Sequence, residues 1–361
     1  MSNSNGMSGG KKHWKGYAIL IGISAALLLG LVLLADPREL AERLSRADLG
    51  LIALAVGLFV LSIALRALRW HLLLRASEQI VRPRTTFSLF AVAQALNDLT
   101  PVKVVGEGAR IIGINRQEGV PIGTGLETVV MEKIMDLVLV TVLLVASMLL
   151  LLPDVPARPW TALAGVVGLV ALANIAVIVV LLRPGAVEKL GRLTVWIVKR
   201  MKRGWGTKLE KDIGRTVESF DRALLSSRHG NRRLTVLAAL VTFPIWGLEF
   251  GRLALIMAAL GAFASPPAVV VASSLAITFQ VFLPAGSGNV AVITDVFAAM
   301  GIALATATAA GLLSVATSIW IAVPMALVAL ALSGRSVKSI EEESADLTEL
   351  TNGAGDRPEG R

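Results

Sequence analysis

Long apolar stretches alternate with short polar segments along most of the chain. The clearest apolar runs are residues 17–35, 51–65, 134–152, 161–182 and 234–260. Most of them approach the roughly 20 residues that an α-helix needs to cross a bilayer, and they lack the alternating pattern of membrane barrel strands. The pattern therefore predicts an all-α, polytopic membrane protein with about six to eight transmembrane helices.

The first apolar run follows a polar, Gly- and Ser-rich start and the basic sequence KKHWK. A signal peptide begins in a similar way, but this run is long enough to span and ends in LLADPRE instead of a small-residue cleavage site. We therefore expect residues 1–16 to be a disordered cytoplasmic N-terminus. Residues 17–335 form the predicted membrane domain, and residues 336–361 form an acid-rich, disordered tail.

Charges between the runs predict which loops face the cytoplasm, because Lys and Arg are enriched there. Residues 36–50 carry three arginines and four acids, which suits an external loop with a short amphipathic helix. Residues 66–84 contain five arginines and one acid, so we predict a cytoplasmic loop. Residues 183–233 give the strongest such signal, with fourteen Lys or Arg and five Asp or Glu.

Within this last stretch, apolar residues recur every three or four positions between basic ones. The periodicity predicts that 184–233 is a basic amphipathic cytoplasmic segment whose helices lie on the inner leaflet. A solvated linker with helical bias is the alternative. Neither reading makes this segment a catalytic domain.

The apolar run 86–100 is too short for an ordinary span and ends in the sequence NDLTPVKVVGEGAR, residues 97–110. This sequence suits either a plain loop or a break in the membrane structure. If 86–100 crossed the membrane, the basic stretch 183–233 would lie outside. We therefore predict a re-entrant segment, shaped by Asn97, Pro101 and Gly106, whose broken backbone lines a cavity.

The second half of the chain follows a similar plan. After residues 234–260, a turn at Pro266 and Pro267 leads to an apolar run that ends in LPAGSGN. We predict a second re-entrant segment there, with helix breaks at Pro284, Gly286 and Gly288. Residues 303–332 are long enough for one tilted span or two short ones, and the basic residues that follow place the C-terminus in the cytoplasm.

Charged residues inside the apolar segments are the candidates for a functional site. A charge at mid-helix costs about 2.5–3.5 kcal/mol on insertion scales, so each one needs a partner, a cavity or a task. Glu132 and Asp136 lie four residues apart on one helix face, which is repulsive unless a cation sits between them. The predicted site residues are Glu107, Arg110, Glu132, Lys133, Asp136, Glu249 and Arg252.

Two interpretations of these charges remain open. Internal ion pairs that fasten helices together would explain any one pair. The combination with two broken hairpins favours a polar site within the membrane, where helix N-termini and arginines suit a phosphate group. In that case Arg110, Lys133 and Arg252 bind the phosphate, while the acids hold these cations or carry protons.

Other chemistries find little support. The chain has no cysteine and three widely spaced histidines, so we expect no metal site, and no cofactor loop or hydrolase elbow is present. The net charge of +9 suits loops that face anionic lipid better than it suits nucleic acid. We therefore expect a protein that is not an enzyme and needs no cofactor.

Four segments carry a family resemblance: RALRWHLLLRA (66–76), NDLTPVKVVGEGARI (97–111), VVMEKIMDLVLV (129–140) and FLPAGSGNVAVITDVFAAMGI (282–302). In this order they resemble the signature segments of the lysylphosphatidylglycerol synthase transmembrane-region family of flippase-like proteins, over about residues 17–335. In the second segment, Pro101, Gly106, Glu107 and Arg110 match a Pro-x-x-x-x-Gly-Glu-x-x-Arg theme. In the third, Lys133 replaces the arginine of Glu-Arg-x-x-Asp.

The last segment departs from the family pattern. Ala285 stands in place of a glycine and Ala291 in place of an acid, which leaves Asp295, one turn later, as its acid. The soluble aminoacyl-transferase domain of bifunctional members is also missing after the last span. The resemblance therefore implies the membrane unit alone, without lipid lysylation.

Together the residues and the resemblance predict a lipid translocase of the inner or plasma membrane. It would move an anionic or modified phospholipid, or a polyprenyl-phosphate-linked lipid, between leaflets. The alternative is a membrane scaffold that partners a lipid-modifying enzyme or glycosyltransferase through its basic segment. A lipid-modifying enzyme is a weaker third possibility, since no nucleophile, metal cluster or cofactor loop stands out.

Overall fold

The computed structural model describes residues 22, 25–99, 105–151, 157–182, 231–279 and 286–332. Over these residues the chain is helical and contains no strand, which confirms the predicted all-α class. Five helices are long and apolar enough to cross a membrane. They are α3 (Leu49–Ala76), α6 (Ile122–Leu150), α7 (Ala157–Leu182), α10 (Arg232–Ala259) and α13 (Leu304–Leu332).

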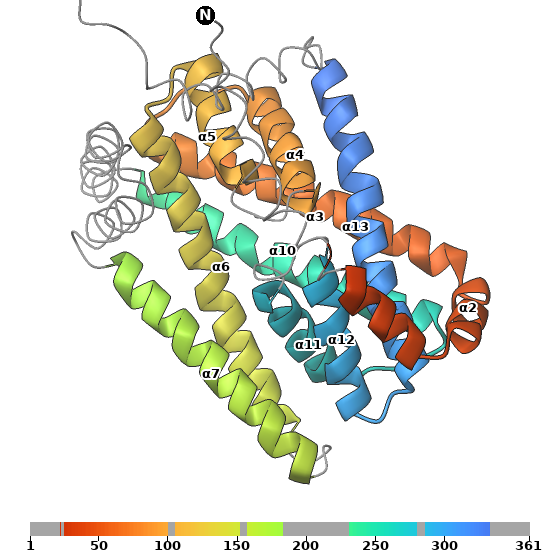
Figure 1. The fold of residues 1–361 in the computed structure, drawn as a ribbon. Helices are drawn as coiled ribbons and strands as arrows, with labels where there is room; N and C mark the ends of the chain where they lie inside the picture. Colours follow the sequence, from red (N-terminus) through yellow and green to blue (C-terminus); the bar gives the residue numbers. More distant parts are fainter. Residues whose placement is uncertain are drawn as a thin grey trace, which may run out of the picture.

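Shorter helices complete the architecture (Figure 1). An apolar helix at Ala25–Leu34 lies within the first predicted span, and α2 (Pro37–Ser45) is the expected amphipathic helix, begun by the Asp36 carboxylate that accepts from the Arg38 N–H. Two pairs of short helices follow later in the chain: α4 (Pro83–Leu99) with α5 (Val105–Glu118), and α11 (Pro266–Phe279) with α12 (Ser287–Ala299).

Several predictions fall outside the described residues. These concern the segments 1–16 and 336–361, almost all of 184–233, and the helix breaks Pro101 and Pro284. The question about residues 303–332 is answered, because α13 is one continuous helix that contains Pro324.

The predicted extent of the loop over residues 66–84 is wrong, while its cytoplasmic location stays a prediction. Helix α3 continues to Ala76 and α4 begins at Pro83, so the connection is short. In the same way α6 begins at Ile122, three turns before the apolar run that predicted it, and Glu132 and Asp136 lie within the helix. The charged turns stay helical because partners on other helices neutralise their side chains, which local hydropathy does not register.

The first pair of short helices forms the predicted hairpin. Gly106 of α5 packs against Ala93 and Asn97 of α4, and Gly113 packs against Leu89. This register makes α4 and α5 antiparallel, so the chain turns back as a re-entrant segment requires. The Asn97 side chain also accepts a hydrogen bond of 2.8 Å from the Gly106 N–H, which caps the start of α5 across the break.

The two hairpins start from opposite ends of the helix bundle. Helices α3 and α10 pack antiparallel: the Asp48 N–H donates to the Ala259 carbonyl at one end, and the Asn231 N–H donates to the Ala76 carbonyl at the other. The hairpin α4–α5 follows the end of α3, whereas α11–α12 follows the end of α10. In Figure 1 the hairpins accordingly lie at different ends of the bundle.

Helices α3 to α6 and α10 to α13 therefore form two inverted copies of one plan. Their lengths are 28, 17, 14 and 29 residues in the first copy and 28, 14, 13 and 29 in the second. Contacts repeat as well. Arg69 of α3 donates to Thr242 of α10, and Arg252 of α10 lies over the Phe59 ring of α3. Arg69 and Arg252 are equally far from the starts of their helices, and so are Phe59 and Thr242, so the two contacts are equivalent.

The tip of the second hairpin reaches the middle of α13. Gly286 lies against Val315, and Gly311 lies against Val290 of α12. On the other flank, the Ser88 hydroxyl of α4 donates to the Ala329 carbonyl. Helix α13 therefore packs against both hairpins.

Cysteine labelling will test the first hairpin, since the chain has no cysteine of its own. Ile80→Cys and Arg116→Cys flank the hairpin at exposed positions and should react with an impermeant reagent from the same side of the membrane, with Phe263→Cys reacting from the other. If Ile80→Cys and Arg116→Cys react from opposite sides, α4 crosses and the fold described here is wrong.

Gly106→Ala should destabilise the protein by about 1–3 kcal/mol, because the added methyl would overlap the Ala93 carbonyl oxygen and lie 2.6 Å from Asn97 Oδ1. Gly108→Ala is the matched control: nothing lies within 4 Å, and alanine favours the helix. Thermal unfolding in detergent measures both. Equal melting temperatures for the two variants would contradict the close packing of α4 on α5.

Candidate functional site

A cavity of about 650 Å³ is lined by residues of both hairpins. The first hairpin contributes Gln94, Asn97 and Asp98 from the end of α4, and the second contributes Thr278 and Asn289 from the ends of α11 and α12. Helices α3, α6, α7, α10 and α13 complete the wall. Polar side chains from both inverted copies therefore line the cavity.

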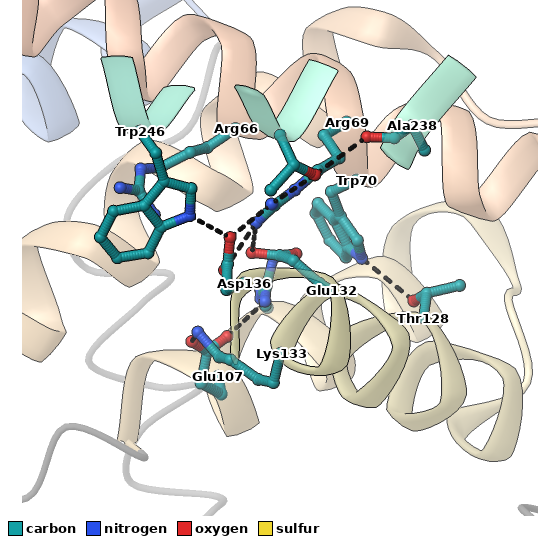
Figure 2. Close-up of polar contacts among 12 residues, drawn as sticks. Arg66, Arg69, Trp70, Glu107, Thr128, Glu132, Lys133, Asp136, Ala238 and Trp246 are labelled. Atoms are coloured by element: carbon teal, nitrogen blue, oxygen red, sulfur yellow. Dashed lines mark hydrogen bonds and ion pairs between the residues drawn. The ribbon is translucent and has the colours of Figure 1, made fainter. Parts of the chain in front are cut away.

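Arg69 of α3 lies between the two acids of α6 (Figure 2). Its guanidinium binds both oxygens of Asp136, at 2.6 and 2.9 Å, and pairs with Glu132 at 3.1 Å. Asp136 also accepts from the Trp246 indole N–H of α10 at 2.9 Å. Arg69 is thus the cation that two carboxylates one turn apart require, and it is fully buried.

Arg110 joins the first hairpin to α6. Its guanidinium pairs with Glu132 at 3.0 Å and with Glu107 at 2.5 Å, and it lies between the rings of Trp70 and Phe90. The pair Glu107–Arg110 forms as predicted, because α5 begins at Val105. Glu132 therefore links Arg69 and Arg110 in one network that holds α3, α5 and α6 together.

Lys133 extends this network toward solvent. Its ammonium group pairs with Glu107 at 2.8 Å, and 47% of its side chain is exposed (Figure 2). Arg110, by contrast, is almost fully buried among two rings and two carboxylates. Arg110 and Lys133, two of the three cations predicted to bind the phosphate, therefore differ strongly in accessibility to solvent.

A second ionic cluster lies beside the first, since the Trp246 ring contacts both Asp136 and Arg66. Glu249 of α10 pairs with Arg66 of α3 at 3.4 Å and with Arg252, one turn along α10, at 3.3 Å. Glu249 also accepts from the Ser62 hydroxyl at 3.1 Å. Arg252 donates further to two neutral groups of α13, the Ser314 carbonyl at 2.8 Å and the Thr317 hydroxyl at 3.2 Å.

Apolar side chains also line the cavity, beside polar ones such as Asn174 and Ser318. Leu137 and Val140 follow the charged turn of α6, Val177 comes from α7, and Ile277 and Ile319 come from the second copy. A wall with ionic groups at one part and aliphatic groups at another suits a ligand with a charged head and an apolar chain.

The structure brings all seven predicted site residues to this one cavity. Of the predicted helix breaks, Asn97 and Gly286 line it, while Gly106 and Gly288 are buried in the helix packing. Asp295 is exposed on α12 and does not line the cavity.

Sequence reasoning missed Arg66 and Arg69, which it placed in a loop. The available signal was their spacing: they lie three residues apart, directly after an apolar run, as Glu249 and Arg252 do within α10. Within the described parts of the chain, no group of three or more His, Asp or Glu side chains is arranged to hold a metal ion.

Comparison of the sequence with known proteins identifies the family. The family model for the lysylphosphatidylglycerol synthase TM region matches residues 18–326, which is most of the chain. The chain belongs to this family. The match covers both hairpins and every residue of the two ionic clusters, so the site lies within the part that the family shares.

Two curated relatives extend the comparison. A UPF0104 membrane protein from Methanothermobacter thermautotrophicus is 27% identical over 327 residues, which cover 89% of this chain and 96% of the relative. Another, from Pyrococcus horikoshii, is 23% identical over 318 residues, which cover 84% of this chain and 93% of the relative. No solved structure gives a significant match. The chain is thus similar to proteins described as membrane proteins along most of its length.

Arg69→Met should destabilise this family member by about 3–5 kcal/mol, because it leaves Glu132 and Asp136 buried with less compensation. Arg46→Met is the matched control. Its ion pair with Glu42 is exposed, at 78% and 56% of the side chains, and should contribute about 0–1 kcal/mol. Melting temperature and yield of monodisperse protein in detergent are the measurements. A stable Arg69→Met variant would contradict the central role of this pair.

Proposed function

We propose that the protein is a lipid translocase of the cell membrane, with both termini in the cytoplasm. It moves a lipid with a phosphate-bearing head group between leaflets, either an anionic or modified phospholipid or a polyprenyl-phosphate-linked lipid. The protein acts without a cofactor and is not an enzyme. The observation that carries the proposal is one cavity with charged side chains that residues of two inverted hairpins line together.

Three observations support a lipid as the ligand. Ionic groups and aliphatic side chains share its wall, which matches a lipid's polar head and apolar chains. Its arginines suit the planar recognition of phosphate oxygens. The family description, lysylphosphatidylglycerol synthase TM region, names a phospholipid and a membrane region.

The inverted copies support movement across the membrane. In many transporters two inverted repeats enclose a site near the bilayer midplane, and rocking of one against the other exposes that site to each side in turn. Here α3 and α10 pack antiparallel at the centre, and each is followed by a broken hairpin from its own end. Exchange of the two hairpins between equivalent arrangements would carry a head group across.

Reconstitution tests the proposal. Purified protein in liposomes with fluorescent phosphatidylglycerol should raise the rate of leaflet exchange above that of empty liposomes, measured by chemical quenching of the outer leaflet. Arg110→Ala should lower the rate by about tenfold or more, because the first hairpin loses the buried Arg110–Glu132 pair with α6. Arg46→Ala, at an exposed ion pair, should match the unchanged protein.

The same leaflet-exchange assay can refute the proposal. If the unchanged protein, Arg110→Ala and empty liposomes exchange this lipid and a polyprenyl-phosphate lipid at the same rate, the protein is not a translocase for them. Size-exclusion elution of Arg110→Ala as a single peak distinguishes lost transport from lost folding.

A further inference from the structure

The cluster of Arg66, Glu249 and Arg252 occupies a special position in the fold. Arg66 in α3 and Glu249 in α10 lie equally far from the starts of their helices, so they are equivalent positions of the two inverted copies. They also contact each other directly, at 3.4 Å. Two equivalent positions touch only next to the axis that relates the copies. The Arg66–Glu249 pair therefore lies next to this axis, near the middle of the α3–α10 pair, and Arg252 joins it from one side.

This cluster is held less tightly than the network around Arg69 and Arg110. Ion pairs in that network measure 2.5 to 3.1 Å, whereas Glu249 lies 3.4 Å from Arg66 and 3.3 Å from Arg252. Charge-assisted hydrogen bonds of full strength are shorter than this, at about 2.7–2.9 Å. The two guanidinium groups near Glu249 thus keep bonding capacity that their partners do not use fully.

A comparison of the two copies shows how this looseness arises. Arg69 and Arg252 are equivalent, and each reaches the long helix that ends its copy. In the first copy that helix, α6, offers the carboxylates of Glu132 and Asp136. In the second copy α13 offers a carbonyl and a hydroxyl. Neutral acceptors orient Arg252 without neutralising it, so its charge depends on Glu249.

Arg66 depends on the same carboxylate. Asp136, which faces this wall as well, is bound bidentately by Arg69 and accepts from Trp246. Within the cluster of Arg66, Glu249 and Arg252, one carboxylate is therefore shared by two guanidinium groups. Arg66, Glu249 and Arg252 all line the cavity, whereas Arg69 does not.

We propose that Arg66 and Arg252 form a clamp for the phosphate group of a lipid, and that Glu249 holds both arginines in place until the phosphate displaces it. This rests on the proposed function and narrows its site. It also moves phosphate binding away from Arg110 and Lys133, whose charges the first network uses to join α5 to α6. Both interpretations of the charges thus apply, each to a different cluster.

The surroundings of the clamp suit a phosphate. Two guanidinium forks can each donate two parallel hydrogen bonds to phosphate oxygens. Arg66 lies over the Trp246 ring at 5.6 Å and Arg252 over the Phe59 ring at 5.2 Å. Rings of this kind exclude water from one side of a cation, which strengthens its attraction for an anion.

Binding titrations of the full chain in detergent, followed by native mass spectrometry, test the clamp. The probes are phosphatidic acid, diacylglycerol with the same chains, and inorganic phosphate. We expect phosphatidic acid to bind at least tenfold more tightly than diacylglycerol, which lacks only the phosphate. Inorganic phosphate should bind more weakly than phosphatidic acid, because it leaves the aliphatic wall unfilled.

Arg66→Gln and Arg252→Gln should each reduce the affinity for phosphatidic acid by about tenfold, since each removes charge-assisted hydrogen bonds. The affinity for diacylglycerol should stay unchanged. Arg46→Gln, at an exposed position remote from the cavity, is the control. Equal affinities of the unchanged protein for the two lipids, or an unchanged preference in both variants, would overturn the clamp.

Glu249→Gln separates a binding role from a structural one. If Glu249 competes with phosphate for the two arginines, its removal should raise the affinity for phosphatidic acid severalfold. If the cluster only fastens α3 to α10, the same change should lower it, which counts against the clamp. This variant also decides the question if either arginine variant fails to elute as a single species.

The clamp and the translocase can fail separately. A preference for phosphatidic acid that depends on Arg66 and Arg252, in a protein that does not exchange lipids between leaflets, supports the clamp and refutes the translocase. Leaflet exchange that persists at the full rate in both arginine variants supports the translocase and refutes the clamp. Inorganic phosphate that displaces phosphatidic acid at equal concentration refutes the assignment to lipid.

Discussion

The ion pair between Arg69 and the two acids of α6 is the interaction on which the rest of the site depends. Glu132 and Asp136 lie one turn apart in an apolar helix, and both remain ionised only if a cation lies between them. Arg69 comes from α3, so the pair fixes α3 against α6. Glu132 then binds Arg110 and positions the first hairpin, and Asp136 orients Trp246 of α10.

The inverted plan explains why one site collects groups from so many helices. Each copy sends a broken hairpin toward the centre, and the central antiparallel pair α3 and α10 places Arg69 and Arg252 on opposite sides of the axis. The copies then differ in chemistry. Carboxylates on α6 lock one arginine, while neutral groups on α13 leave the other dependent on a shared acid. An architecture with nearly symmetric geometry thereby acquires one cluster with two carboxylates around Arg69 and one in which two arginines share a carboxylate, the cluster that we propose binds an anion.

Much of the fold could be predicted from the sequence because its signals are local. Apolar runs of spanning length mark most of the long helices, and polar breaks near Asn97 and Gly286 mark the hairpins. The boundaries of α3 and α6 could not be predicted in this way. Local hydropathy does not distinguish their charged turns from loops. The partners that make these turns compatible with a bilayer lie far away in the chain. Arg66 and Arg69 were missed for the same reason.

The sequence by itself determined that the protein is an all-helical membrane protein with two interrupted segments, and which acids and bases lie in its apolar parts. It also indicated that Glu132 and Asp136 need a cation. Only the tertiary structure decided which cation that is, that both hairpins line one cavity, and which two arginines share a single carboxylate. The physical reason is that hydropathy and helix breaks act between neighbouring residues, whereas neutralising a charge in an apolar medium requires a partner at about 3 Å from any helix that the fold brings there.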